Sequence, residues 1–257
     1  MENDLKIIKD GIQAGIEKGY FQRIAYENSD NVLQDDIIEY IFTMNVAREV
    51  LERIINNKLG HTVHIEYSSN SFINNAFQIY SATGGPDNYD SNIRKNHKPF
   101  GSESGRIDIS VMKHPPLAYS QLRSFVGIEL KAINPNDKKL LDDYDRLAHA
   151  MIETDPAGAN NIERCYVAFA KRLDTPKQLF QKEDFVSSLE IYLKELNNLI
   201  EYNSTIKGIE FSVDHFVIIN QPSSEYAKSI PEEWWDENNI RSNSGSVIGI
   251  IITLIRK

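Results

Sequence analysis

The segment FVGIELKAI, residues 125–133, has the composition of a buried β-strand, yet it carries two charged side chains. Apolar residues fill most of its positions, and Glu129 and Lys131 stand two residues apart. Alternate residues of a strand point to the same face of its sheet. A carboxylate and an ammonium group therefore project side by side, which requires either a solvent-exposed strand edge or a functional site.

A second charged strand precedes this one. The segment GRIDISVMK, residues 105–113, carries Asp108, which lies 21 residues before Glu129. If the two strands pair as antiparallel neighbours, both carboxylates meet at one end of the sheet. Two buried carboxylates repel each other and lose hydration. A divalent cation relieves both costs, and Mg²⁺ is usually bound through one or two carboxylates together with water.

Hydrophobic periodicity predicts an alternation of helices and strands along the whole chain. The expected helices cover residues 4–19, 34–60, 137–151 and 181–201, and the expected strands cover 62–68, 75–81, 105–113, 125–133, 163–172, 215–222 and 247–255. Apolar residues nearly surround the helix at 34–60, which predicts burial on more than one side. The first helix, with three glycines, is expected to be short and weak.

These elements predict an α/β fold with a mixed central sheet flanked by helices on both faces. No shift in composition divides the chain, so residues 1–257 are expected to form a single domain. Its core covers about 34–172, and residues 173–257 form a C-terminal extension.

Asp108, followed by Glu129-Leu130-Lys131 on the next strand, resembles the signature of the PD-(D/E)xK nuclease superfamily. The resemblance implies the restriction-endonuclease-like fold, whose αβββαβ core agrees with the elements expected from 34 to 172. The sequence departs from the pattern at Ile107, where the signature has proline.

The resemblance implies metal-dependent hydrolysis of phosphodiester bonds, in DNA rather than RNA. Asp108, Glu129 and the backbone carbonyl of Leu130 would hold Mg²⁺, or Mn²⁺ in its place, and Lys131 would orient or activate the attacking water. Many members add a glutamate from the helix before the first strand, and Glu49 is the first choice here, ahead of Glu52 and Glu39. Such enzymes act in restriction, anti-phage defence, repair or transposition. The acidic net charge favours a homodimer or a targeting partner, since a dimer cuts both strands by symmetry.

Basic side chains in two places are candidate contacts to a DNA backbone. In the polar loop at 84–104 and in the helix at 137–151 they are Arg94, Lys95, His97, Lys98, Arg146 and His149. The alternative is that both groups are ordinary solvated surface charge.

Composition excludes several other classes. The formal net charge of −9 disfavours a protein whose whole surface binds nucleic acid. No phosphate-binding glycine loop, dinucleotide fingerprint or HExxH motif is present, so ATP, NAD and zinc-hydrolase chemistry are not expected. A single cysteine, Cys165, and the lack of an export signal or a bilayer-length apolar run indicate a cytoplasmic protein with no membrane segment.

Three other interpretations stay open. Glu129 and Lys131 form a solvated surface pair; or the chain is a catalytically inactive nuclease-fold subunit with a binding or scaffolding role; or it is a regulatory protein whose acidic surface binds a basic partner. The last one requires Asp108 and Glu129 to be exposed and far apart.

Overall fold

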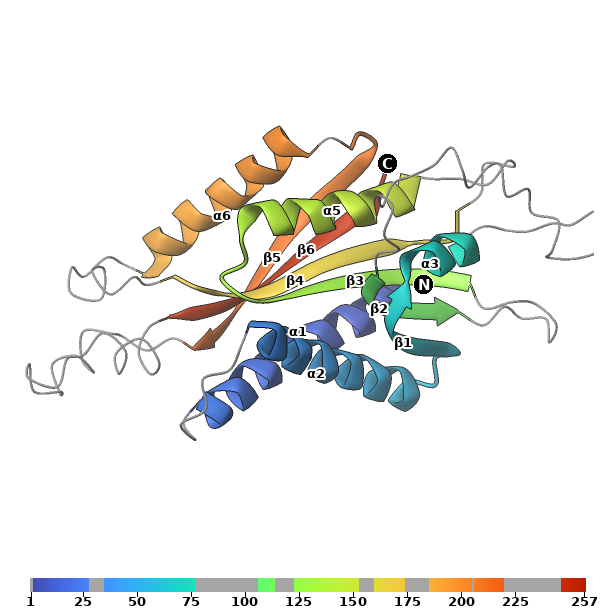
Figure 1. Cartoon of the computed structure of the whole chain (residues 1–257), viewed down its shortest axis with the longest axis horizontal. Helices are drawn as coiled ribbons and strands as arrows, with labels where there is room; N and C mark the ends of the chain where they lie inside the picture. Colours follow the sequence, from blue (N-terminus) through green and yellow to red (C-terminus); the bar gives the residue numbers. More distant parts are fainter. Residues whose placement is uncertain are drawn as a thin grey trace, which may run out of the picture.

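The computed structural model describes residues 2–27, 35–76, 106–113, 123–152, 160–173, 185–204, 206–219 and 246–257. These residues form one six-stranded sheet with helices on both faces (Figure 1). The strands are β1 (His61–Ser68), β2 (Arg106–Lys113), β3 (Arg123–Ile133), β4 (Arg164–Arg172), β5 (Ile209–Ile219) and β6 (Val247–Arg256). The helices are α1 (Glu2–Glu27), α2 (Asp35–Asn56), α3 (Ser69–Ala76), α5 (Asp137–Ile152) and α6 (Phe185–Asn203).

The sheet has the strand order β1-β2-β3-β4-β6-β5. Only β3 and β4 are parallel, and the other neighbours are antiparallel. A parallel pair needs a crossover connection, and α5 lies in the connection between these two strands. The expected α/β fold with a mixed, helix-flanked sheet is confirmed, and helix, three strands, helix and strand follow one another from α2 to β4, with α3 added after β1.

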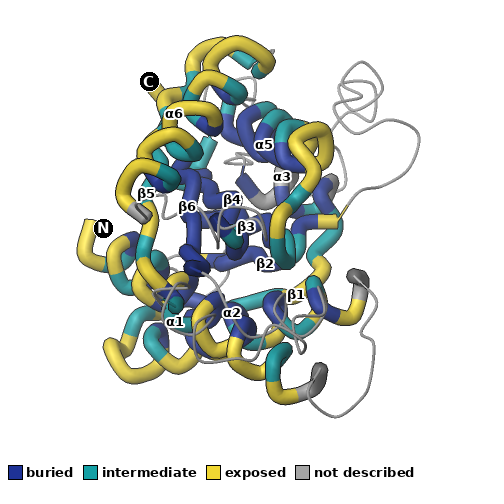
Figure 2. The backbone as a smooth tube through the Cα atoms, turned by 90° about the vertical axis from the view of Figure 1, so that its left-hand side faces the viewer, coloured by how far each residue is buried: buried dark blue, intermediate teal, exposed yellow. Residues whose placement is uncertain are grey.

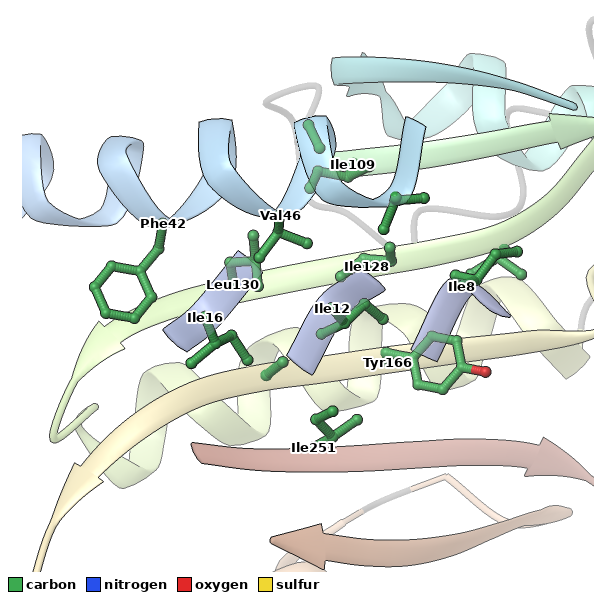
Figure 3. Packing of buried hydrophobic residues seen from close by; sticks show 14 of the residues in the cluster. Ile8, Ile12, Ile16, Phe42, Val46, Ile109, Ile128, Leu130, Tyr166 and Ile251 are labelled. Atoms are coloured by element: carbon green, nitrogen blue, oxygen red, sulfur yellow. The ribbon is translucent and has the colours of Figure 1, made fainter. Parts of the chain in front are cut away.

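Two helical layers sandwich the sheet. In Figure 1, α1 and α2 lie below it, and α5 and α6 lie above it. Alternate residues of each strand enter the two cores: in β4, Tyr166 and Ala168 face α1 and α2, whereas Val167 and Phe169 face α5 and α6. Figure 3 shows the lower core, where Ile8, Ile12 and Ile16 of α1 meet the sheet. Burial on both faces explains the long apolar runs of β3, β4 and β6.

Three glycines of α1 let it pack closely against α2. A Cβ atom added at Gly15 would lie 2.3 Å from Cα of Val46, and one at Gly11 would lie 2.9 Å from Cα of Val50. The 26-residue helix α1 is therefore neither short nor weak, contrary to the expectation for residues 4–19. Glycine costs helix propensity, but here it allows the two backbones to approach.

Two further expectations are wrong. Helix α2 buries one face and leaves the other exposed (Figure 2). Ile55 on the outer face is 63% exposed. The strand expected at 75–81 begins inside a helix, because Ala76 ends α3; residues 77–81 lie outside the described part of the chain. The last strand in the sequence is not at the edge of the sheet, because β6 lies between β4 and β5. Among the described residues, no helix has both the length and the hydropathy needed to cross a bilayer.

Candidate active site

Asp108 and Glu129 lie where the pairing of β2 with β3 stops. The register runs from Lys113 opposite Arg123 to Ile109 opposite Ile128, and within the described residues it goes no further. Asp108 and Glu129 are the next residues on the two strands, so they lie across from each other. Both strands are held by pairing up to this point, which fixes where the two carboxylates project.

The carboxylate of Asp108 takes over a hydrogen bond that strand pairing no longer supplies. The backbone N–H of Leu130 donates to Oδ2 of Asp108 over 2.7 Å. Burial raises the pKa of Asp108 to about 6, against the opposing effects of this hydrogen bond and of the Lys131 charge. Asp108 is thus anchored on β3 while it remains a titratable group near neutral pH.

Glu129 is a buried carboxylate in a cluster of acids. Its side chain is 1% exposed and lies on the face that α5 covers, as does Gly127 two residues earlier, whose missing Cβ would touch Leu147 of α5. Burial, then the charges of Asp108 and Asp143, raise the pKa of Glu129 well above its ordinary value. These carboxylates are therefore close enough to repel one another.

Lys131 joins helices from both layers. Its Nζ donates to Oε1 of Glu39 on α2 over 3.1 Å and lies 2.9 Å from Oδ2 of Asp143 on α5. Burial acts to lower the pKa of Lys131, but Asp143, Glu39 and Asp108 outweigh it, and the pKa is raised above its usual value. Lys131 is accordingly a fixed cation in this site.

Arg146 of α5 is the second cation. Its Nε lies 3.1 Å from Oε1 of Glu129, and its Nη2 donates to Oδ1 of Asp143 three residues earlier on the same helix. We call Glu39, Asp108, Glu129, Lys131, Asp143 and Arg146 the charged cluster. It contains four carboxylates and two cations, so its side chains leave a formal surplus of two negative charges.

The structure thus brings Asp108, Glu129 and Lys131 together but leaves Glu49 outside. Glu49 is buried against Lys18 of α1 and lies 2.8 Å from Arg53. It is ten residues from Glu39 along α2, which is about 15 Å at 1.5 Å per residue. The carboxylate that α2 contributes to the cluster is Glu39, so the first choice of Glu49 is corrected.

The other candidates divide in the same way. Arg146 belongs to the charged cluster, whereas His149 lies half-buried one turn further along α5 and is not part of it. Leu130 is buried, and its carbonyl as a metal ligand stays a prediction. Arg94, Lys95, His97 and Lys98 lie outside the described residues.

The burial of Glu129 also decides between earlier alternatives. A solvated surface pair and an acidic docking surface both need Glu129 to be exposed, and it is 1% exposed. The requirement that Asp108 and Glu129 lie far apart is likewise not met, because the charge of Asp108 raises the pKa of Glu129.

Cys165 is buried, which raises its pKa to about 12, so its thiol stays neutral.

Asp143 and Glu39 are the functional candidates that the sequence analysis missed or ranked low. Asp143 interrupts the buried face of α5 between Leu140 and Leu147, and a charge in such an apolar stripe is the signal that reveals it. No comparable signal separates Glu39 from Glu49, since both follow the periodicity of the buried face of α2. The difference comes from α1, whose Lys18 neutralises Glu49.

The donor set of the site suits a hard divalent cation. Oε1 of Glu129 is buried without a hydrogen bond within the described residues, although it lies near Arg146. Carboxylate oxygens of this kind are the ligands that Mg²⁺ and Mn²⁺ prefer. Among the described residues, no three His, Cys, Asp or Glu side chains are already grouped as metal ligands.

Comparisons with known proteins add no relative. No protein family matches this chain, and no significant match occurs among curated proteins or solved structures.

Proposed function

We propose that this protein is a Mg²⁺-dependent nuclease, able to use Mn²⁺, that hydrolyses phosphodiester bonds of DNA. The observation that carries the proposal is the meeting of Asp108, Glu129 and Lys131 at the point where β2 and β3 cease to pair. A buried acid pair beside a fixed lysine is costly for folding alone, and a catalytic role accounts for it.

The proposed metal ligands are Asp108, Glu129 and the carbonyl of Leu130. Two carboxylates suffice for this ion, because Mg²⁺ keeps several waters and takes one or two carboxylates from a protein. When bound, Mg²⁺ acts as a Lewis acid on the phosphate and lowers the pKa of water. The hydrogen bond from Leu130 N–H holds the Asp108 carboxylate in position for this role.

Lys131 serves as a hydrogen-bond donor and a positive charge. Because its pKa is raised, it remains an ammonium ion and does not accept a proton from water. It can orient the attacking water or stabilise the charge that develops on the phosphate. Glu39 and Asp143 hold its Nζ from two helices, so its position is set before substrate arrives.

The order of elements from α2 to β4 supports assignment to the restriction-endonuclease-like fold and the PD-(D/E)xK superfamily. DNA contacts are proposed for Arg94, Lys95, Lys98, Arg146 and His149. The surplus of acidic residues in the chain favours a homodimer or a targeting partner that helps bring DNA to the site. Restriction or anti-phage defence is the proposed context.

A cleavage assay with matched lysine variants tests the proposal. Plasmid, linear and single-stranded DNA are incubated with the protein in Mg²⁺, Mn²⁺ or EDTA. Lys131→Met is compared with Lys113→Met, which removes a lysine that lies over the Phe125 ring at the far end of the β2–β3 pairing. We expect cleavage that needs metal, falls at least about 100-fold in Lys131→Met, and is retained in Lys113→Met.

Cleavage that survives EDTA, or equal loss in both lysine variants, would refute the assigned roles.

A second function is favoured by one observation: Arg146 and Lys131 already neutralise part of the acid cluster internally. A catalytically inactive nuclease-fold subunit would keep such a network for structure alone. It predicts a folded wild-type protein that cuts no DNA under any of these conditions and binds no divalent metal.

A further inference from the structure

Arg146 occupies the place beside Glu129 that a cation would take. Its guanidinium reaches from α5 to the sheet, with Nε 3.1 Å from Oε1 of Glu129, and it also bonds Asp143. The Glu129 side chain is 1% exposed, whereas Arg146 is 23% exposed. Arg146 is therefore partly open to solvent, whereas the carboxylate that it contacts is not.

The contact between Arg146 and Glu129 depends on charge rather than on hydrogen-bond geometry. Although the two atoms lie within ion-pair distance, both Nε of Arg146 and Oε1 of Glu129 lack a hydrogen bond within the described residues. Buried ion pairs are strong only where aligned hydrogen bonds accompany them. This contact is therefore one that a better cation can replace.

The two contacts of Arg146 can break separately. Its bond to Asp143 lies within α5, at a spacing of three residues, so the two side chains move together with that helix. Its contact with Glu129 joins α5 to β3. Lys131 differs, because Glu39 and Asp143 hold it from two helices, which leaves Arg146 as the cation that can leave Glu129.

We propose that Arg146 is an internal counter-ion that competes with the divalent metal for Glu129. In the metal-free protein the guanidinium lies beside the buried carboxylate and offsets part of its charge. A dication and a guanidinium beside the same carboxylate repel each other, so metal entry moves Arg146 away from Glu129 while Asp143 keeps it at the site. Its freed N–H donors are then available to a phosphate group. This inference rests on the proposed metal-dependent function.

Metal binding to variants of the full chain tests the competition without relying on cleavage. Mn²⁺ and Mg²⁺ affinities are measured by isothermal titration calorimetry at fixed pH, without DNA. Arg146→Gln keeps a polar but shorter side chain and removes the charge, Arg146→Lys keeps the charge, and Asp108→Asn is the control that loses a ligand. We expect Arg146→Gln to bind metal roughly tenfold more tightly than wild type. Arg146→Lys should stay close to wild type.

The outcomes separate this inference from the proposed function. If wild type binds metal through Asp108 but Arg146→Gln binds it equally or more weakly, the competition is refuted and the metal site stands. If neither wild type nor any variant binds metal, the metal-dependent function itself fails, and the inference fails with it.

A measurement on the wild-type protein guards against a variant that does not fold. The Nε–H resonance of Arg146, assigned by its loss in a conservative Arg146→Lys variant, is followed by NMR during Mg²⁺ titration. We expect it to shift and to exchange faster with water as Arg146 leaves Glu129. A resonance that is unchanged at saturating Mg²⁺ would refute the displacement.

Discussion

At the scale of single residues, the charged cluster is held by groups that oppose each other. Asp108, Glu129 and Asp143 repel one another, and Lys131 and Arg146 offset only part of that repulsion. Buried acids with raised pKa values destabilise the folded state once they ionise. The cluster therefore lowers the stability of the folded protein at neutral pH, and the same surplus of negative charge attracts a cation.

The pKa of Asp108 predicts a pH-dependent loss of stability in the metal-free protein. Its folded pKa of about 6 exceeds the value of about 4 in an unfolded chain, so the unfolded state releases this proton at lower pH. The free energy of unfolding contributed by this group should fall as pH rises from about 4 to about 6, by about 3 kcal/mol. Buried Glu129 extends the fall to higher pH.

Urea unfolding in EDTA at several pH values measures this effect against Asp108→Asn, whose side chain does not ionise. As pH rises from about 4 to about 6, the free energy of unfolding of wild type should fall relative to that of Asp108→Asn. Curves that stay parallel would show that Asp108 ionises normally. Adding Mg²⁺ should restore wild-type stability above pH about 6, because metal ligands must be deprotonated.

The two glutamates of α2 should have separate effects. Glu39→Gln removes a partner of Lys131 and should lower cleavage about tenfold or more, while unfolding changes little because Glu39 is 38% exposed. Glu49→Gln should cost about 1 kcal/mol of stability through Lys18 and Arg53 and leave cleavage nearly unchanged. Urea unfolding and plasmid cleavage on both variants check this, and the reverse pattern would restore Glu49 to the site.

Sequence alone predicts that Asp108, Glu129 and Lys131 lie together, because charges in buried strands conflict with their surroundings and so stand out. It does not rank Glu39 above Glu49, because both share one helical face and only the position of Lys18 distinguishes them. Asp143 was detectable as a charge on an apolar helix face. The choice between Glu39 and Glu49 depends on contacts between segments that are far apart in the sequence, and a local sequence pattern does not show such contacts.

At the scale of elements, the packing of α1 on α2 depends on glycine. Most helix and strand boundaries follow from periodicity to within a few residues, as for β3, α5 and β4. The length of the first helix does not follow from periodicity, because glycine has low helix propensity. Its glycines allow close packing, and this is visible only when Val46 and Val50 of α2 are seen to lie against them.

Gly15→Ala should therefore destabilise the protein although alanine favours helices by about 1 kcal/mol. The new Cβ would lie 2.3 Å from Cα of Val46, and separating the helices should cost about 2 kcal/mol or more. Gly19→Ala is the control, because its Cβ would lie 3.2 Å from Cα of Phe42, and the two effects should nearly cancel. Equal stabilities of the two variants in urea would contradict the close approach.

At the scale of the whole molecule, the C-terminal strand joins two parts of the sheet. β6 pairs with β4 on one side and with β5 on the other, so within the described sheet β5 is joined to the other strands through β6. The sequence predicts a buried strand here from its apolar run. Its insertion between β4 and β5 is a long-range pairing that no local signal encodes.

Removal of residues 246–257 should therefore abolish cooperative unfolding rather than trim an extension. Loss of β6 leaves the backbone edge of β4 unpaired and leaves β5 without a partner in the described sheet. Removal of Lys257 alone is the control: it deletes an exposed ion pair with Glu210 and one terminal backbone hydrogen bond to Gly208, and should cost little stability. Thermal unfolding followed by circular dichroism compares the two, and a cooperative transition in the longer truncation would contradict the central position of β6.

The metal site at the end of the β2–β3 pairing is tested most directly by anomalous diffraction from crystals soaked in Mn²⁺. We expect an anomalous peak within about 2.5 Å of carboxylate oxygens of both Asp108 and Glu129. It should be missing in crystals of Asp108→Asn. A Mn²⁺ peak elsewhere on the protein, with Asp108 and Glu129 left without one, would contradict the proposed site and the nuclease function built on it.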